Sequence, residues 1–459
     1  SSRRPRDPKP GSPASPPEAG RQTTLNGVST EPMSALAIGS TQALSPEAAG
    51  EALASQIEKA LEGAAAVGGG LLLATSAAGD QGLEVGRILG RRWPGADLAG
   101  TSFEGIVSGG QLRRDRPALA LLAWSDGGAR PGLFGVDARE DHVPGLLAHE
   151  ILEAAGRPAL SPEDLVLLFP DVHSPRVIEP ILSSLSPSLG GAAIAGAGAS
   201  GLDGEPAPAW LESESWAGSW VGLVLPGAGG GNPTATERSG PSRPCPAPRP
   251  RVLTAPATRA CSPWLRVTGR RGHWIERLDG EPALARLRRE LGLTARSSLG
   301  DTLDRLLVRI RAPRPEDAPQ AALDSEPAGD PVVHEERFVI GIDERRGALS
   351  LPTAVGSGEQ IAFALPDPGV AREALRVGIE AIDRTECLLH FGCRTRDASL
   401  HGDPDLEPAL VAHLARDRAT FGTVGPLQLG PDRSGGIRLL VHATVLAALG
   451  AARGADDSR

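Results

Sequence analysis

A unit of strand, helix, strand and glycine-rich turn occurs three times in this chain, and this repetition constrains the fold more than any other feature of the sequence. The first copy begins with the apolar run GGLLLATS (69–76) and continues through QGLEVGRILGRRW (81–93), in which apolar residues recur at near-helical spacing. A second apolar run, ADLAG (96–100), leads into the turn GTSFEGIVSGG (100–110), and ALALLAW (118–124) closes the copy. Short apolar runs indicate buried strands, and apolar residues three and four apart indicate an amphipathic helix.

The second and third copies repeat this order. The second consists of DLVLLFP (164–170), VIEPILSSL (177–185), AAIAG (192–196), the turn AGASGLDG (197–204) and the closing run SWVGLVLP (219–226). The third consists of CLLHFGC (387–393), LEPALVAHLARD (406–417), TFGTVGPLQLGP (420–431) and the closing run IRLLVHATVLAAL (437–449). Units of this length favour parallel neighbouring strands with right-handed crossovers. The sequence therefore predicts an α/β fold of two domains, with mixed sheets flanked by helices.

Segments rich in proline, glycine, serine and charge divide the chain. We predict a disordered tail (1–32), an α/β domain (33–226), a linker (227–251), a second α/β domain (252–450) with a disordered insertion (312–330), and a disordered end (451–459). The only methionine, Met33, directly follows the first tail. We interpret it as the natural start of the protein or as the point where the fold begins.

Charge and cysteine content narrow the classes of function. The formal net charge is -9 and the basic residues are scattered, so nucleic acid is not expected as a partner. The four cysteines form no C-x-x-C pair, which fits a reducing compartment and predicts no metal site. No apolar run is long enough to span a bilayer, and the N-terminal residues do not resemble an export signal. We therefore expect a cytoplasmic protein.

Two glycine motifs are similar to catalytic or nucleotide-binding signatures, but their contexts differ. Gly100 to Gly105 resembles the G-x-S-x-G turn around a nucleophilic serine, here Ser102, yet it has one residue too many and leads into an apolar run rather than a helix. Gly196 to Gly201 matches G-x-G-x-x-G, yet the residues that follow have no helical period and supply no helix N-terminus for a pyrophosphate. No cofactor is therefore expected, and a serine hydrolase is kept as an alternative.

The three glycine turns are expected at one edge of the fold. Ligands of open α/β sheets bind beyond the carboxyl ends of the strands, and glycine lets backbone amides approach a guest, so the turns together predict a small-molecule cleft. Arg394 and Arg396 directly follow a strand, where they would form a fork for a carboxylate. Solvated surface arginines are the alternative interpretation, and His442 is expected to be half-buried within a strand.

Several segments resemble the FIST proteins, a family of sensory modules with an N-terminal and a C-terminal part. GTSFEGIVSGGQLRRDRPALALLAW and GGAAIAGAGASG are similar to the glycine loops of the N-terminal part. CSPWLRVTGRRGHWIERLDGEPALARLRREL, LLHFGCRTR and FGTVGPLQLGP are similar to segments of the C-terminal part. The closing loop of the family usually carries Gly-Glu and an aliphatic residue, whereas Pro426 follows Gly425 here. If the family glutamate pairs with the ammonium group of a ligand, this chain lacks that partner.

The resemblance implies intracellular sensing of a small molecule, with amino acids or related metabolites as ligands, a protein partner that receives the signal, and no catalysis. On this basis the residues expected to contact the ligand are Thr101, Ser102, Glu104, Ser200, Cys393, Arg394, Arg396 and Thr423. Hydroxyls would orient the guest, the arginines would bind a carboxylate, and Glu104 would meet a cationic group. The alternatives are a hydrolase that uses Ser102 or Cys393, and a scaffold whose pocket no longer binds.

Overall fold

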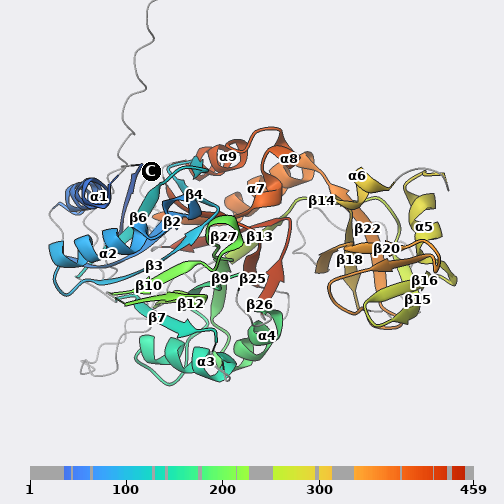
Figure 1. Cartoon of the computed structure of the whole chain (residues 1–459), viewed down its shortest axis with the longest axis horizontal. Helices are drawn as coiled ribbons and strands as arrows, with labels where there is room; N and C mark the ends of the chain where they lie inside the picture. Colours follow the sequence, from blue (N-terminus) through green and yellow to red (C-terminus); the bar gives the residue numbers. More distant parts are fainter. Residues whose placement is uncertain are drawn as a thin grey trace, which may run out of the picture.

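The structure, a computed structural model, describes residues 36–42, 45–62, 66–126, 130–139, 143–173, 178–212, 214–226, 252–294, 299–312, 335–382, 385–416, 418–431 and 437–449. The predicted tails, the 227–251 linker and Met33 lie outside these residues, as does the predicted insertion apart from residue 312. Three six-stranded sheets form the body of the protein, and a nine-stranded sheet forms a satellite that projects to the right in Figure 1.

Each body sheet is built around one repeated unit. The first sheet has the order β1 (Leu36–Thr41), β6 (Leu119–Ser125), β2 (Val67–Thr75), β3 (Asp97–Phe103), β10 (Pro208–Leu211) and β11 (Glu214–Ala217). The second has the order β26 (Ile437–Leu440), β25 (Gln428–Pro431), β9 (Ala193–Ala197), β8 (Leu165–Phe169), β12 (Ser219–Leu225) and β7 (Gly132–Asp137). The third has the order β13 (Val252–Pro256), β27 (Ala443–Leu449), β23 (Cys387–Cys393), β24 (Ala419–Gly425), β4 (Gly105–Ser108) and β5 (Gln111–Arg114).

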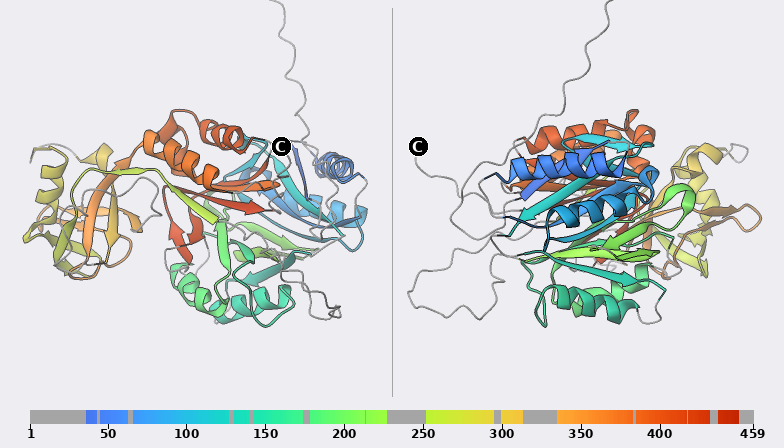
Figure 2. Two further views of the ribbon diagram at one scale, coloured as in Figure 1. Left: turned by 180° about the vertical axis from the view of Figure 1, so that it is seen from behind. Right: turned by 60° about the vertical axis from the view of Figure 1, so that its left-hand side comes forward.

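A pair of helices covers the outer face of each sheet, as Figure 2 shows. The pairs are α1 (Pro46–Ala60) with α2 (Gln81–Arg92), α3 (Val143–Ala154) with α4 (Ile178–Ser188), and α7 (Pro368–Ala381) with α9 (Leu406–Ala415). The three inner faces share one apolar core, to which the first, second and third units all contribute buried side chains. The structure therefore confirms the predicted α/β class, with mixed sheets flanked by helices.

Local sequence explains where two of these helices begin. Ser45 precedes α1 and its hydroxyl accepts a hydrogen bond from the amide of Ala48, while Pro46 occupies the first helical position. Asp367 precedes α7 and its carboxylate accepts from the amide of Val370, again with a proline next in sequence. These side chains bond an amide that has no partner inside the helix, and proline at the first position loses no helical hydrogen bond.

The three units place their parallel strands in the same register. Strand β2 pairs with β3, β8 with β9, and β23 with β24, each in parallel. Gly100, Gly196 and Gly422 occupy equivalent positions in the second strand of each pair, and a Cβ atom on them would lie 2.1, 1.9 and 1.8 Å from a carbonyl oxygen of the first strand. Glycine is required here because any side chain would collide with the neighbouring backbone.

The glycine-rich turns do not stay in their own sheets, which sequence reasoning did not anticipate. After β3, the chain crosses to the third sheet, where β4 pairs with β24. After β9, it crosses to the first sheet, where β10 pairs with β3, and after β24 it crosses to the second sheet, where β25 pairs with β9. Each unit thus contributes a hairpin to the sheet of another unit. The first unit contributes to the third sheet, the third unit to the second sheet and the second unit to the first sheet, which closes the cycle.

Two expectations about strands need correction. The run IRLLVHATVLAAL is not one strand: β26 ends at Leu440 in the second sheet and β27 begins at Ala443 in the third. His442 lies at the break with a φ of 53°, and it is buried rather than half-buried. The second and third sheets combine strands from both sides of residues 227–251, and the two-domain boundary there stays a prediction.

The satellite contains the strands β14 (Thr258–Ala260), β15 (Leu265–Arg271), β16 (Trp274–Leu278), β17 (Glu281–Pro282), β18 (Leu307–Arg311), β19 (Glu335–Phe338), β20 (Gly341–Asp343), β21 (Ala348–Ser350) and β22 (Gln360–Pro366). Its helices are α5 (Ala283–Glu290) and α6 (Gly300–Leu303). It has its own apolar core. Ion pairs tie β19 to the body, because Arg337 contacts Glu179 of α4 and Glu335 contacts Arg438 of β26.

The glycine register gives a direct test of the fold. Replacement of Gly196 by alanine would place a Cβ atom 1.9 Å from the carbonyl oxygen of Leu168, so the two strands must separate. We expect Gly196→Ala to lower the free energy of unfolding by more than about 2 kcal/mol in urea denaturation. Gly90→Ala in α2 is the control, because nothing lies within 4 Å of its added methyl group. That variant should gain up to about 1 kcal/mol. Equal stabilities would contradict the register.

Candidate functional site

The three segments through which the chain leaves one sheet for the next, here called corners, meet at one end of the body. The first corner is Glu104, the second begins at Gly198 and the third is residues 426–427. Ser102, beside the first corner, donates its hydroxyl hydrogen to the carbonyl of Ser200 at 2.8 Å, and the Ser200 amide donates to the Ser102 carbonyl at 2.9 Å. The Gly198 amide donates to the carbonyl of Leu427 at 2.9 Å. Backbone bonds therefore link all three corners.

Strand register makes the chemistry of the corners comparable. Because Gly100, Gly196 and Gly422 are equivalent, Glu104, Ser200 and Pro426 are equivalent as well. Of these three equivalent residues, only Glu104 carries a charge. Glu104 accepts a hydrogen bond from Nη1 of Arg394 at 2.8 Å, and their side chains are 30% and 55% exposed. The pair joins residues that lie 290 positions apart in the sequence.

Aromatic side chains pack between the inner faces of the sheets beneath the corners. The ring centroids of Phe103 and Phe169 are 5.4 Å apart, and those of Phe169 and Phe391 are 5.9 Å apart, both in edge-on arrangements. Thr101, on the same inner face, donates to the carbonyl of Pro208 at 3.0 Å. Hydrocarbon thus occupies the region below the corners, which leaves the partly exposed rim around Glu104 as the accessible part of the predicted site.

Ser102 lies in a position that does not suit a nucleophile. Its side chain is fully buried, and its hydroxyl donates to a carbonyl oxygen rather than to a histidine. An attacking serine needs a base within hydrogen-bond reach and an exposed oxygen. The buried hydroxyl instead joins the first and second corners.

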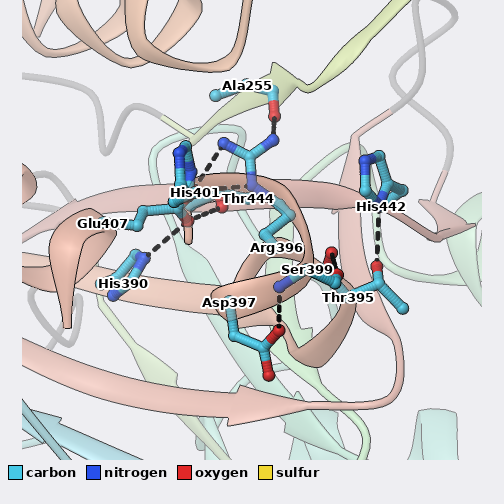
Figure 3. A network of polar contacts seen from close by, with 10 residues as sticks. All are labelled: Ala255, His390, Thr395, Arg396, Asp397, Ser399, His401, Glu407, His442 and Thr444. Carbon is cyan, nitrogen blue, oxygen red and sulfur yellow. Dashed lines mark hydrogen bonds and ion pairs between the residues drawn. The ribbon is translucent and has the colours of Figure 1, made fainter. Parts of the chain in front are cut away.

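Glu407 is the centre of a buried polar network in the third unit, shown in Figure 3. Its carboxylate contacts four side chains: Arg396, His390, His401 and Thr444. Nε of Arg396 donates to Oε2 at 2.8 Å, and Nε2 of His401 lies 3.1 Å from the same oxygen. The pattern of the sequence did not indicate this network, because a glutamate in the first turn of a helix is ordinary and its partners come from four other elements.

Arg396 was expected to bind the carboxylate of a ligand, but the structure gives it a partner within the chain. Its guanidinium is buried and binds Glu407, and its Nη1 also donates to the carbonyl of Ala255 at 3.0 Å. Arg394 differs from Arg396, because its side chain is exposed at the first corner. Of the two arginines that flank Thr395, only Arg394 is placed to meet a molecule from solution.

The charge on Glu407 depends on these partners. Burial alone would raise the pKa of its carboxyl group, but the nearby Arg396 and the hydrogen bonds from His390 and His401 hold that pKa well below its usual range. A buried carboxylate of this kind contributes stability only while it is ionised.

Three other residues expected at the site are buried: Cys393, Thr423 and Ser200. Sγ of Cys393 lies 3.1 Å from Oγ1 of Thr395, which lies 2.8 Å from Nδ1 of His442. Burial lowers the pKa of His442 to about 4, so its ring is neutral at pH 7. The histidine reaches Cys393 only through Thr395, so no direct thiol-histidine pair exists here. The hydroxyls of Thr423 and Ser200 are buried and have no hydrogen-bond partner among the described residues.

One group of possible metal ligands occurs among the residues that the structure describes. His149, Glu150 and Glu153 lie together on α3, on the helix that covers the second sheet. Two of the three side chains are exposed, and the group is not at a corner. It therefore adds nothing to the candidate site.

Comparison with known proteins assigns the class of the first two units. Residues 69–244 match the family model of the FIST N domain. The match covers most of the first unit and the second unit, and the family that it identifies is one of sensory domains. A comparison with curated proteins found no match. Within the part of the chain that the structure describes, no helix is both long and apolar enough to cross a membrane.

The buried network predicts a pH-dependent effect. Glu407→Gln would leave the Arg396 guanidinium buried without its counter-ion, and we expect a loss of about 3 kcal/mol in the free energy of unfolding at pH 7. Because the folded-state pKa of Glu407 is depressed, its stabilising effect is present above about pH 4.5 and is lost as the pH falls further. The difference between the variant and the wild type should therefore shrink in acid.

The control for this experiment is Glu373→Gln, which removes an exposed partner of Arg376 on α7. Its melting temperature should stay close to that of the wild type, because exposed ion pairs contribute little. A Glu407 variant that behaves like the Glu373 variant at every pH would contradict the role assigned to the network.

Proposed function

We propose that this chain is a sensory protein that binds a small carboxylate-bearing molecule at the first corner, where the Glu104–Arg394 pair responds to it. The observation that carries the proposal is the pair itself: it is charged, partly exposed and formed between two units. The membership of residues 69–244 in a sensory domain family supports the same class of function.

The chemistry of the pair favours a zwitterionic ligand. A guanidinium binds a carboxylate through paired hydrogen bonds, so a ligand carboxylate would compete with Glu104 for Arg394. The carboxylate of Glu104, once displaced, would meet an ammonium group on the same ligand. Separation of the pair is inexpensive, because exposed ion pairs contribute about 0–1 kcal/mol. Amino acids and related metabolites carry both groups.

The location of the pair provides a route for a signal. Glu104 is the single residue between β3 of the first sheet and β4 of the third sheet. Arg394 begins the turn that leads to Arg396 and the buried Glu407 network. A ligand that separates Glu104 from Arg394 would act on the connection between two sheets, and a protein partner would read the change.

The remaining expectations belong to this proposal. Residues 252–450, which resemble the C-terminal FIST part, would supply the third unit and the satellite. The protein would act in the cytoplasm. The other residues expected at the site, which are Thr101, Ser102, Ser200, Cys393 and Thr423, would shape the corners from the buried side. A hydrolase that uses Ser102 or Cys393 has less support, since neither side chain is exposed.

The proposal is tested by thermal unfolding in the presence of single amino acids and their derivatives. A ligand at a hundredfold its dissociation constant should add about 2.7 kcal/mol to the stability of the wild type. We expect Arg394→Ala to abolish this shift, since it removes the carboxylate partner. Glu104→Gln should weaken it for ligands that carry an ammonium group and spare ligands that carry only a carboxylate.

Arg376→Ala is the matched control, because Arg376 is another exposed arginine in ion pairs, on α7, and its partners Glu373 and Glu380 lie on the same helix. It should leave every ligand-induced shift unchanged. A scaffold without a working pocket would show no shift with any candidate. A shift that survives Arg394→Ala would place the ligand elsewhere.

A further inference from the structure

Two polar residues, Asp171 just beyond the end of β8 and Ser219 at the start of β12, lie on the inner face of the second sheet. Asp171 pairs with Ala199 in an isolated parallel bridge, and Val221 pairs with Phe169 in the antiparallel register of β12 and β8. Extension of that register by two residues brings Ser219 opposite Asp171. Side chains two residues apart on a strand point to the same face. Since Phe169 and Val221 belong to the central core, Asp171 and Ser219 face it too.

Each of these two residues has one side-chain oxygen without a hydrogen-bond partner among the described residues. Oδ1 of Asp171 accepts a hydrogen bond from the amide of His173 at 3.0 Å. Oδ2 of Asp171 and Oγ of Ser219 have no hydrogen-bond partner among the described residues. Both residues are deeply buried, with exposed fractions of 0% and 1%. The extended register thus places a carboxylate oxygen and a hydroxyl on opposed residues of neighbouring strands, each without a hydrogen-bond partner among the described residues.

The backbone around Asp171 leaves room beside the open oxygen. Gly218, directly before Ser219, has a φ of 77°, which favours glycine, and a Cβ atom built there would lie 3.6 Å from Oδ2 of Asp171. Because Gly218 has no side chain, it places no side-chain atom beside Oδ2 of Asp171. A donor group placed there would be within reach of Oδ2.

The equivalent positions in the other two sheets have partners of their own. In the first sheet, the hydroxyl of Thr75 donates to the carbonyl of Arg116 at 2.8 Å and accepts from the amide of Ala118 at 3.0 Å. In the third sheet, Sγ of Cys393 contacts Thr395. Among these three positions, the second sheet therefore differs from the other two by an acceptor without a partner among the described residues.

An unpaired carboxylate in a core is costly unless it is protonated or meets a cation. Burial raises the pKa of Asp171, although the amides of His173 and Ala207 oppose the rise. A divalent metal ion would need about six oxygen ligands, which one carboxylate oxygen and one hydroxyl do not supply. A small group with N–H donors needs fewer partners and forms charge-assisted hydrogen bonds with the carboxylate.

We propose that Asp171 and Ser219 hold a small ammonium group, either a free ammonium ion or the terminal amine of a metabolite. Oδ2 of Asp171 supplies the negative charge and accepts one N–H, and Oγ of Ser219 accepts a second. This position is independent of the Glu104–Arg394 pair, and it adds a second binding site to the inner face of the second sheet.

The test is the melting temperature of the wild type at pH 7.5 in ammonium, methylammonium, potassium and tetramethylammonium chloride at equal ionic strength. Ammonium should give a saturable rise of a few degrees, because a ligand that binds only the folded state stabilises it. Tetramethylammonium, which has no N–H donor, should give none. An effect of methylammonium equal to or larger than that of ammonium identifies the amine of a metabolite as the guest, and an effect of ammonium alone identifies the free ion.

Asp171→Asn should abolish the ammonium-dependent rise whether it raises or lowers the basal melting temperature, and Ser219→Ala should reduce it. Asp164→Asn is the matched control: Asp164 is another buried aspartate of the second sheet region, paired with Arg157, and its variant should keep the rise. Arg394→Ala should keep it as well, which separates this result from that of the corner. Equal effects of ammonium and potassium, no effect of ammonium, or an unchanged effect in Asp171→Asn would overturn the proposal.

Discussion

The exchange of hairpins between the three units is the constraint on which the rest of the structure depends. No body sheet is complete with the strands of its own unit, because β4, β10 and β25 are each supplied by another one. The inner faces can therefore bury a single shared core only when all three units are present. The glycines at positions 100, 196 and 422 allow the paired strands to approach closely enough for this arrangement, since a side chain there would meet a carbonyl oxygen.

The three equivalent corner positions carry different side chains. Glu104 is charged and partly exposed, Ser200 is buried with a hydroxyl that has no hydrogen-bond partner among the described residues, and Pro426 is apolar. The strand ends behind them differ in the same way, with Thr75 satisfied, Asp171 open and Cys393 in contact with Thr395. Repetition therefore supplied three equivalent positions, and substitution made them unequal.

Sequence reasoning identified the units and the parallel pairs, since short-range apolar periodicity specifies them. It did not find the destination of each hairpin, because the partner strand of β4 lies about 300 residues further along and no local pattern encodes that pairing. For the same reason Arg394 and Arg396 looked alike in the sequence, although one lies at the rim and the other binds Glu407. The break at His442 was missed because the apolar run continues through it, and only tertiary pairing divides the run between two sheets.

The closed cycle also limits how this protein can be divided. The segment that matches the FIST N domain contains β4 and β10. The strand that pairs with β4 is β24, which lies far beyond the end of that segment. Severed from the rest, that segment would expose the β4–β5 hairpin and the unpaired edge of β9 where β25 normally lies. Bare strand edges of this kind recruit strands from other molecules. Residues 69–244 alone therefore lack strands that complete their sheets. We expect a chain shortened to these residues to exchange hairpins with other molecules.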